Sequence, residues 1–325
     1  MATPSTTDTE DSPSAPLVSC FVTGTGLATR RPLLALVPLL SGLLSLDQLE
    51  RAARADTAFQ LNFALPVPLA DLWTFLDAPT REGVTVFGYS ARTVQRQPEL
   101  LGGALLVEGG ALLLLGLLTA VYLGAIDDAL AGRRSEHLAN LRQHAPVTLA
   151  FAALQFLGLL VLLGIGTLGT GTGSIRGSAG PLVLALLGGI VGLYLLTPGV
   201  YVGVAARLGP RTAFDRGIDV ALTSEYLAFA LCHALAVVAV SVPLSAVGFA
   251  GGLGSLVFVA PVAAPVGLVL NGATMAFVRS QVDGGVESPE DLGEGPPPAP
   301  AARPPSDGAD RDPDSPLDSG PDTEE

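Results

Sequence analysis

The sequence contains no lysine, and all 17 of its basic residues are arginine. It has only two cysteines, Cys20 near the N-terminus and Cys232 inside an apolar run, which supports neither a disulfide framework nor a cysteine metal site. Charged residues make up just 14% of the chain, whereas hydrophobic residues make up 49%. The mean hydropathy of +0.51 is far above that of a soluble domain. We therefore predict an integral membrane protein.

Motifs for catalysis and cofactor binding are also missing. The sequence has no nucleophile elbow, catalytic-triad motif, zinc signature or nucleotide fingerprint. His137 and His144 are seven residues apart without further ligands in a metal motif, so we interpret them as a solvated pair. We expect no catalytic residue, no metal, no cofactor and no nucleic-acid partner. An enzyme is the function class with the least support.

The acidic residues are concentrated at the two ends of the chain. Thirteen of the 30 lie from Asp283 onwards and three precede Cys20, whereas the region between has about as many arginines as acidic residues. Polar, proline-containing segments of this kind cannot bury enough apolar surface to fold. We predict a disordered N-terminal arm at residues 1–19, a transmembrane domain at 20–280, and a disordered acidic, proline-rich tail at 281–325.

Apolar runs of about 20 residues, the length needed to cross a bilayer, recur between these ends. They predict an all-α fold, a polytopic membrane helical bundle of about six transmembrane helices, at residues 32–49, 102–126, 146–166, 181–206, 225–248 and 253–278. Residues 50–101 form one larger outer loop. Its segment 58–76 contains two prolines and several polar residues, and we interpret it as interfacial or re-entrant, with a spanning segment as the alternative.

The arginines indicate the orientation of the spans. Most arginines near the predicted spans flank them on one side, and the short loops on the opposite side contain only Arg176. The exception is the larger outer loop, which contains five arginines, but long segments cross the membrane with less regard to charge. Because positive residues collect in cytoplasmic loops and six spans return the chain to its starting side, we predict a cell-membrane protein with both termini in the cytoplasm. Arg30 and Arg31 ahead of the first apolar run leave an alternative, a cleaved twin-arginine export leader.

A short pattern occurs twice, as Val-Tyr-Leu-Gly at 121–124 and as Val-Tyr-Val-Gly at 200–203, 79 residues further along. Both copies end a span that is predicted to run from outside to inside, so the repeat is a parallel helical-hairpin repeat. Each copy is followed by an arginine-bearing segment with helical periodicity. We interpret these segments as amphipathic elbows at the inner membrane surface.

Membrane lipid is the expected partner of the elbows, because arginine is attracted to anionic headgroups. The alternative is that the elbows dock a cytoplasmic protein. The candidate contact residues are Arg133, Arg134, Arg211, Phe214 and Arg216.

The Tyr-x-Gly helix ends, the elbow segments 126–130 and 211–217, the lysine-free composition and the acidic tail together resemble a known group of proteins. These are the multi-pass membrane proteins of halophilic archaea that are grouped only as families of domains of unknown function. The resemblance covers roughly residues 20–280. It implies a six-helix membrane protein and no particular activity.

Polar side chains inside membrane spans are costly and are therefore candidate ligand or ion sites. Glu108, His233 and Asn271 are the main candidates, with Gln155 as a further one. His233 and Asn271 are expected at similar depth, where they either share a polar site or bind separate neighbours. With the repeat and the elbows, these residues favour a transport or permease-like component. The alternative is a non-catalytic membrane scaffold, assembly or envelope-associated protein, because buried polar groups are few.

Overall fold

The computed structural model describes residues 17–45, 48–49, 52, 61–76, 85–86, 89–90, 98–171, 175–250 and 253–284. The chain divides into two units, residues 1–285 and 286–325. All described residues belong to the first unit. The predicted acidic tail from residue 285 and the predicted N-terminal arm as far as residue 16 therefore lie outside the described part of the chain.

The described residues contain five long helices: α6 (Pro98–Leu130), α7 (His137–Gly171), α8 (Ile175–Ala205), α10 (Ser224–Ala250) and α11 (Leu253–Gly284). By length and composition each is able to cross a membrane, and a bent pair of shorter helices near the N-terminus adds a sixth span if it is counted as one. Large apolar side chains on these helices are exposed, with Leu106 at 79% and Leu184 at 71%. Such a surface requires lipid, and the predicted helical, multi-pass membrane protein is confirmed.

The first predicted span, at residues 32–49, differs from the structure. The chain forms three short pieces in this region, α1 (Leu17–Arg30), the 3₁₀ turn η1 (Pro32–Ala35) and α2 (Leu36–Leu44). The helical segment 17–30 and the helical segment 32–44 meet at a bend of 99°. Arg31 leaves helical geometry with φ −132° ahead of Pro32, which lacks the N–H that a continuing helix needs. The last three residues of the predicted disordered arm belong to α1, which packs along α11.

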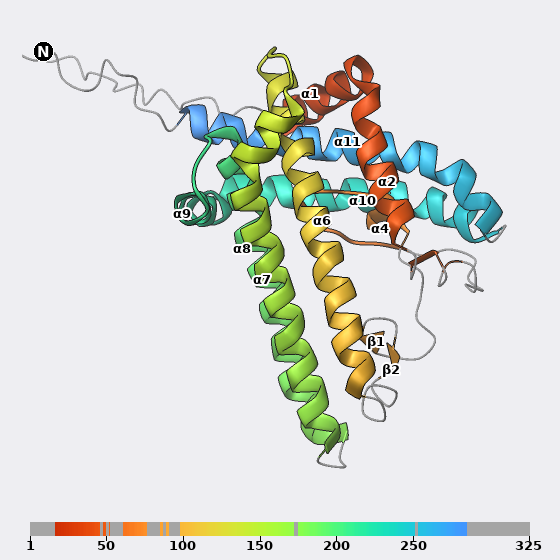
Figure 1. Ribbon diagram of the computed structural model, residues 1–325. Coiled ribbons are helices and arrows are strands. Elements are labelled where there is room, and N and C mark those ends of the chain that lie inside the picture. The colour runs from red at the N-terminus through yellow and green to blue at the C-terminus, as the bar shows by residue number, and fades with distance from the viewer. Residues whose placement is uncertain are drawn as a thin grey trace, which may run out of the picture. The chain divides into compact units, whose positions relative to one another are not determined.

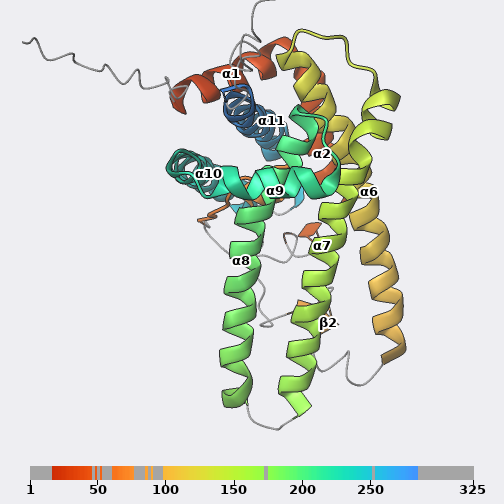
Figure 2. The same cartoon turned by 90° about the vertical axis from the view of Figure 1, so that its left-hand side faces the viewer.

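Helices α6, α7 and α8 lie side by side, and α6 and α8 run in the same direction (Figure 1). Helices α10 and α11 form a second group that runs across the first group, as the turned view also shows (Figure 2). The main hydrophobic core includes Tyr122, Tyr201, Tyr226, Phe229 and Phe277, which come from both groups. The described helices therefore do not form a simple up-and-down bundle.

The segment 61–71 has neither helix nor strand and is followed by the short helix α4 (Leu72–Phe75). Its two prolines prevent a continuous helix. Trp73 is only 8% exposed and donates its indole N–H to the Gly42 carbonyl at 2.7 Å, so its ring packs inside the protein. In the predicted interfacial or re-entrant segment 58–76, Leu61 and Phe63 are exposed, whereas most residues from Pro66 onwards are buried and α4 packs on α2, α10 and α11. We name residues 61–76 the wall loop. Further on, β1 (Thr85–Val86) and β2 (Tyr89–Ser90) pair antiparallel.

The two Tyr-x-Gly copies lie near the ends of α6 and α8 and use their glycines alike. A Cβ on Gly124 would lie 2.8 Å from the Asn140 side chain, and a Cβ on Gly203 would lie 2.8 Å from the Val147 side chain, so both glycines admit α7. The segments that follow the two copies differ. The first predicted elbow begins as the last turns of α6, whereas the second is a separate helix, α9 (Pro210–Ala221). After α9, helix α10 packs on α11 and α4.

Candidate functional site

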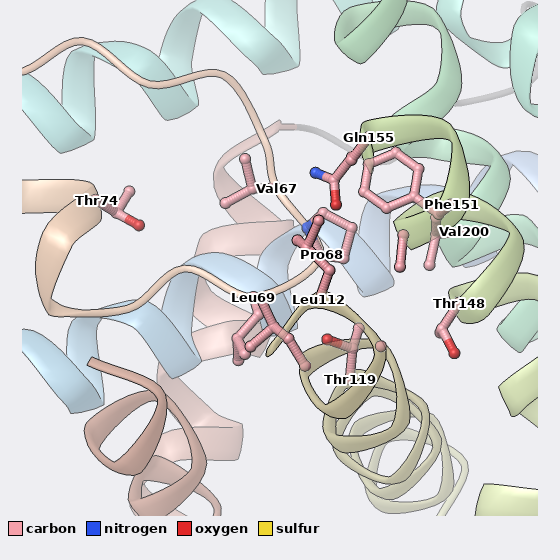
Figure 3. A pocket seen from close by; sticks show the side chains of 13 residues that line it. Val67, Pro68, Leu69, Thr74, Leu112, Thr119, Thr148, Phe151, Gln155 and Val200 are labelled. Carbon is pink, nitrogen blue, oxygen red and sulfur yellow. The ribbon is translucent and has the colours of Figure 1, made fainter. Parts of the chain in front are cut away.

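A cavity of about 240 Å³ lies between α6, α7 and the wall loop (Figure 3). Its lining residues come from four places in the chain: Leu112, Leu115, Gly116 and Thr119 of α6, Thr148, Phe151, Ala152 and Gln155 of α7, Val200 of α8, and Val67, Pro68, Leu69 and Thr74 of the wall loop. All the lining residues on helices α6, α7 and α8 fall inside candidate membrane spans. The cavity therefore lies at the depth of these spans.

The wall loop brings irregular backbone into contact with this cavity. At membrane depth such backbone is tolerated only where protein or a cavity satisfies its polar groups. The loop's own helix start is satisfied locally, because the Asp71 carboxylate accepts from the backbone N–H of Trp73 at 3.0 Å and from the Ser41 hydroxyl at 3.2 Å. The backbone just before Asp71 needs other partners.

Asn271 of α11 supplies those partners. With the amide oriented so that every donor meets an acceptor, Nδ2 donates to the Val67 carbonyl at 3.0 Å and Oδ1 accepts from the Ala70 N–H at 3.0 Å. The same amide donates to the Tyr201 oxygen at 3.1 Å and accepts from the Tyr122 hydroxyl at 3.3 Å. Tyr201 in turn donates to the Val67 carbonyl at 2.8 Å. The two repeat tyrosines and Asn271 thus fix the loop that forms one wall of the cavity, and we call these three residues the amide hub.

The amide hub is fully enclosed. Asn271 and Tyr201 are 0% exposed and Tyr122 is 1% exposed. An amide is well suited to this place because one side chain offers both a donor and an acceptor to the backbone. Close approach is required too: a Cβ on Gly267, one turn before Asn271, would overlap the Ala70 carbonyl oxygen. Helix α11 therefore contacts the wall loop backbone to backbone.

A cluster of charges ties the ends of α6, α7 and α11 together. Asp127 accepts from Arg133 at 2.5 Å and from Arg279 at 2.7 Å, and Asp128 accepts from Arg133 at 3.0 Å. Asn140 donates to the other oxygen of Asp128 at 2.9 Å. The hydrogen bond to Asp128 raises the pKa of the Arg133 guanidinium, which stays charged. Both aspartates are buried, so each needs these partners.

His144 lies one turn along α7 from Asn140 and contradicts the prediction of a solvated histidine pair. His137 is exposed, but His144 is only 3% exposed, and its Nδ1 has no hydrogen-bond partner among the described residues. The reason is the close packing of α6 on α7 at Gly124, where a Cβ would lie 2.9 Å from the His144 ring. Residues 140, 144 and 148 share one face of α7, so a polar line leads from the charge cluster to the cavity.

The three residues predicted to bind a ligand or ion lie in different places. Asn271 belongs to the amide hub. Glu108 is half-buried on α6, one turn before Leu112, and is not a lining residue of the cavity. His233 is fully buried on α10 beside Phe229, with ring centroids 6.3 Å apart, and is not among the hydrogen-bond partners of Asn271. His233 and Asn271 therefore do not share a site through direct hydrogen bonds.

The predicted elbow residues also lie in different surroundings. Arg133 is part of the charge cluster, whereas Arg134, Arg211 and Arg216 are exposed. Phe214 faces inwards, because a Cβ on Gly199 of α8 would lie 2.5 Å from its ring. Phe214, which is half-buried, therefore packs α9 on α8.

The cavity was not predicted from the sequence. Gln155 is the one polar lining residue that the sequence had marked as a candidate. A signal was available in α7, where Asn140, His144, Thr148 and Gln155 recur at helical spacing in an apolar run. Comparison of the chain with protein-family models, with curated proteins and with solved structures finds no match, so the role of each residue has to be argued from geometry.

Proposed function

We propose that the protein is a transport or permease-like component of the cell membrane, and that the cavity between α6, α7 and the wall loop holds its solute. One observation carries the proposal: a cavity of about 240 Å³ lies within the candidate spans, with irregular backbone as part of its wall. Transporters commonly build their binding sites in this way, from interrupted segments near the middle of the membrane. A concave site of mainly apolar side chains with a few polar groups is also typical of small-molecule binding.

Two consecutive alanines of α7 offer a matched pair of positions for a test. Ala152 lines the cavity and is 7% exposed, whereas its neighbour Ala153 is exposed and lines no part of it. Leucine at either position adds three carbon atoms to the same helix. Only Ala152→Leu puts them into the cavity.

We expect Ala152→Leu to lower solute flux at least about tenfold, which corresponds to about 1.4 kcal/mol of added barrier, within the 1–3 kcal/mol typical of overpacking. Ala153→Leu should retain the rate of the unaltered protein. The measurement is osmotic reswelling of proteoliposomes, followed by light scattering, for erythritol, urea, glycine and lactate. If none of these solutes enters faster than in protein-free vesicles, the transport role loses to the scaffold alternative.

The proposal includes an orientation, in which the arginine-bearing helix ends face the cytoplasm. The end of α11 meets the end of α6 through Arg279 and Asp127. Arg134, Arg211 and Arg216 add exposed positive charge to the α6–α7 turn and to α9. Positive residues favour the cytoplasmic side, and anionic headgroups attract each arginine there by about 1 kcal/mol. If α1 and α2 together count as one span, both termini of the chain are cytoplasmic.

A cysteine-labelling experiment tests this orientation. Cys20 is only 2% exposed and would be a poor reporter, so both native cysteines are first replaced by serine. Ala139→Cys, exposed near the start of α7, should react with a membrane-impermeant maleimide only after the cells are permeabilised. Gly180→Cys, exposed near the start of α8, should react in intact cells. The reverse pattern would show that the protein is inserted the other way round.

A further inference from the structure

Some polar side chains around the cavity have hydrogen-bond partners within the protein, and others do not. Neither the Thr119 hydroxyl nor the Gln155 side-chain amide makes a hydrogen bond within the part of the chain that the structure describes, although both residues line the cavity. A threonine in a membrane helix ordinarily bonds the carbonyl one turn back. Thr148 follows that rule, with its hydroxyl 3.3 Å from the His144 carbonyl, and keeps its oxygen lone pairs available. Two unused polar groups and one unused acceptor therefore border the cavity.

The lining also excludes charge. None of the thirteen lining residues carries a charged side chain. No carboxylate of α6 is a lining residue: Glu108 lies one turn before Leu112, outside the lining, and Asp127 and Asp128 are engaged by Arg133, Arg279 and Asn140. A charged solute would lose its hydration without meeting an opposite charge, and that loss is far larger than the cost of burying a hydroxyl that finds a partner. The cavity therefore selects against ions.

The size of the cavity and its apolar wall limit which ligands fit. A cavity volume of about 240 Å³ limits the ligand to a small molecule. Leucine, valine, phenylalanine and proline side chains make up most of the wall, and they suit a carbon skeleton. The hydroxyl of Thr119 and the amide of Gln155 suit the hydroxyl groups of a ligand. Gln155 lines the cavity and is itself exposed.

We propose, building on the transport role above, that the cavity binds a small neutral polyol of about four carbon atoms. Its hydroxyl groups bond Thr119, Gln155 and the oxygen of Thr148, and its carbon chain lies against Pro68, Leu112 and Phe151. Figure 3 shows these lining side chains grouped around Pro68. A carboxylate on the same carbon skeleton is rejected.

Saturation-transfer NMR on the protein in nanodiscs tests the proposal without requiring transport. Erythritol is the probe, erythronate is the charged match with the same four carbons, and trehalose is the oversized control. We expect transfer to erythritol only. Thr119→Val, which keeps the side-chain shape, should weaken erythritol binding roughly three- to tenfold, as for one lost neutral hydrogen bond. Ala152→Leu should abolish binding, and Ala153→Leu should leave it unchanged.

Either of two results would overturn the polyol assignment: erythronate binding as well as erythritol, or erythritol binding that Ala152→Leu does not alter in a folded protein. Circular dichroism and gel filtration of each variant establish folding, and Thr119→Val serves if Ala152→Leu does not fold. A failure of the polyol assignment can be distinguished from a failure of the transport role. Erythritol binding without flux would refute transport and keep the site, whereas flux of another solute that Ala152→Leu blocks would keep transport and refute the polyol.

Discussion

Replacing Gly267 by alanine should destabilise the protein by about 3 kcal/mol or more, the largest effect we expect from a single methyl group. At this position the new Cβ overlaps the carbonyl oxygen of Ala70. Because the obstacle is backbone, no rotamer change relieves it, and either α11 or the wall loop has to move. The free energy of unfolding, measured by denaturant titration in detergent, should fall accordingly.

Gly254 provides the matched control on the same helix. A Cβ there meets nothing within 4 Å, so Gly254→Ala adds helix propensity without a clash. We expect it to be neutral or to stabilise the protein by up to about 1 kcal/mol. The two substitutions thus have opposite signs. A Gly267→Ala protein as stable as the unaltered one would mean that α11 does not contact the wall loop in the way described.

Replacing Asn271 by leucine should cost about 2–6 kcal/mol. The shape is nearly kept, but the Ala70 N–H and the Tyr122 hydroxyl lose their partner inside a closed core, and each orphaned buried group costs about 1–3 kcal/mol. The Val67 carbonyl keeps its bond from Tyr201. We therefore expect the wall loop to loosen at Ala70 first, and erythritol binding to be lost even at temperatures where the helices persist.

Tyr122→Phe is the graded control for that experiment. It removes one hydroxyl and leaves the Asn271 oxygen with the Ala70 N–H, so a loss of only about 1 kcal/mol is expected. Thermal unfolding followed by circular dichroism, together with the fluorescence of Trp73, the single tryptophan of the chain, reports the helices and the wall loop separately. If Asn271→Leu cost no more than Tyr122→Phe, the amide hub would not be what holds the wall loop.

Membrane-length apolar runs predicted the long helices, because a span must satisfy all its backbone groups internally and leaves a strong compositional signal. Pro32 was predicted as the start of the first span, but helix α1 before it was missed, because the run from Pro32 is by itself about long enough for a span. The wall loop was recognised as irregular, but its burial was not. A tryptophan beside polar residues is equally typical of a membrane surface and of a core that offers the indole N–H a carbonyl.

The amide hub shows where sequence reasoning stops. Asn271 was recognisable because an amide inside a span is costly, and the repeated Tyr-x-Gly pattern was recognisable as a repeat. Their meeting was not predictable, because it depends on which face of α11 crosses α6 and α8. His144 failed for the same reason: as one of two histidines near a predicted turn it looked solvated, and only the packing at Gly124 buries it.

The ion pair between Asp127 and Arg279 joins residues 152 positions apart. The amide hub likewise requires Asn271 of α11. At about 5–20 residues per second of synthesis, Asp127 exists for roughly 8–30 seconds with no partner from α11. The wall loop meanwhile lacks the amide that holds Val67 and Ala70. The wall of the cavity is consequently completed only after α11 has been made. A nascent chain cut short before α11 would reach the membrane with its other long apolar helices made and the wall loop without its amide.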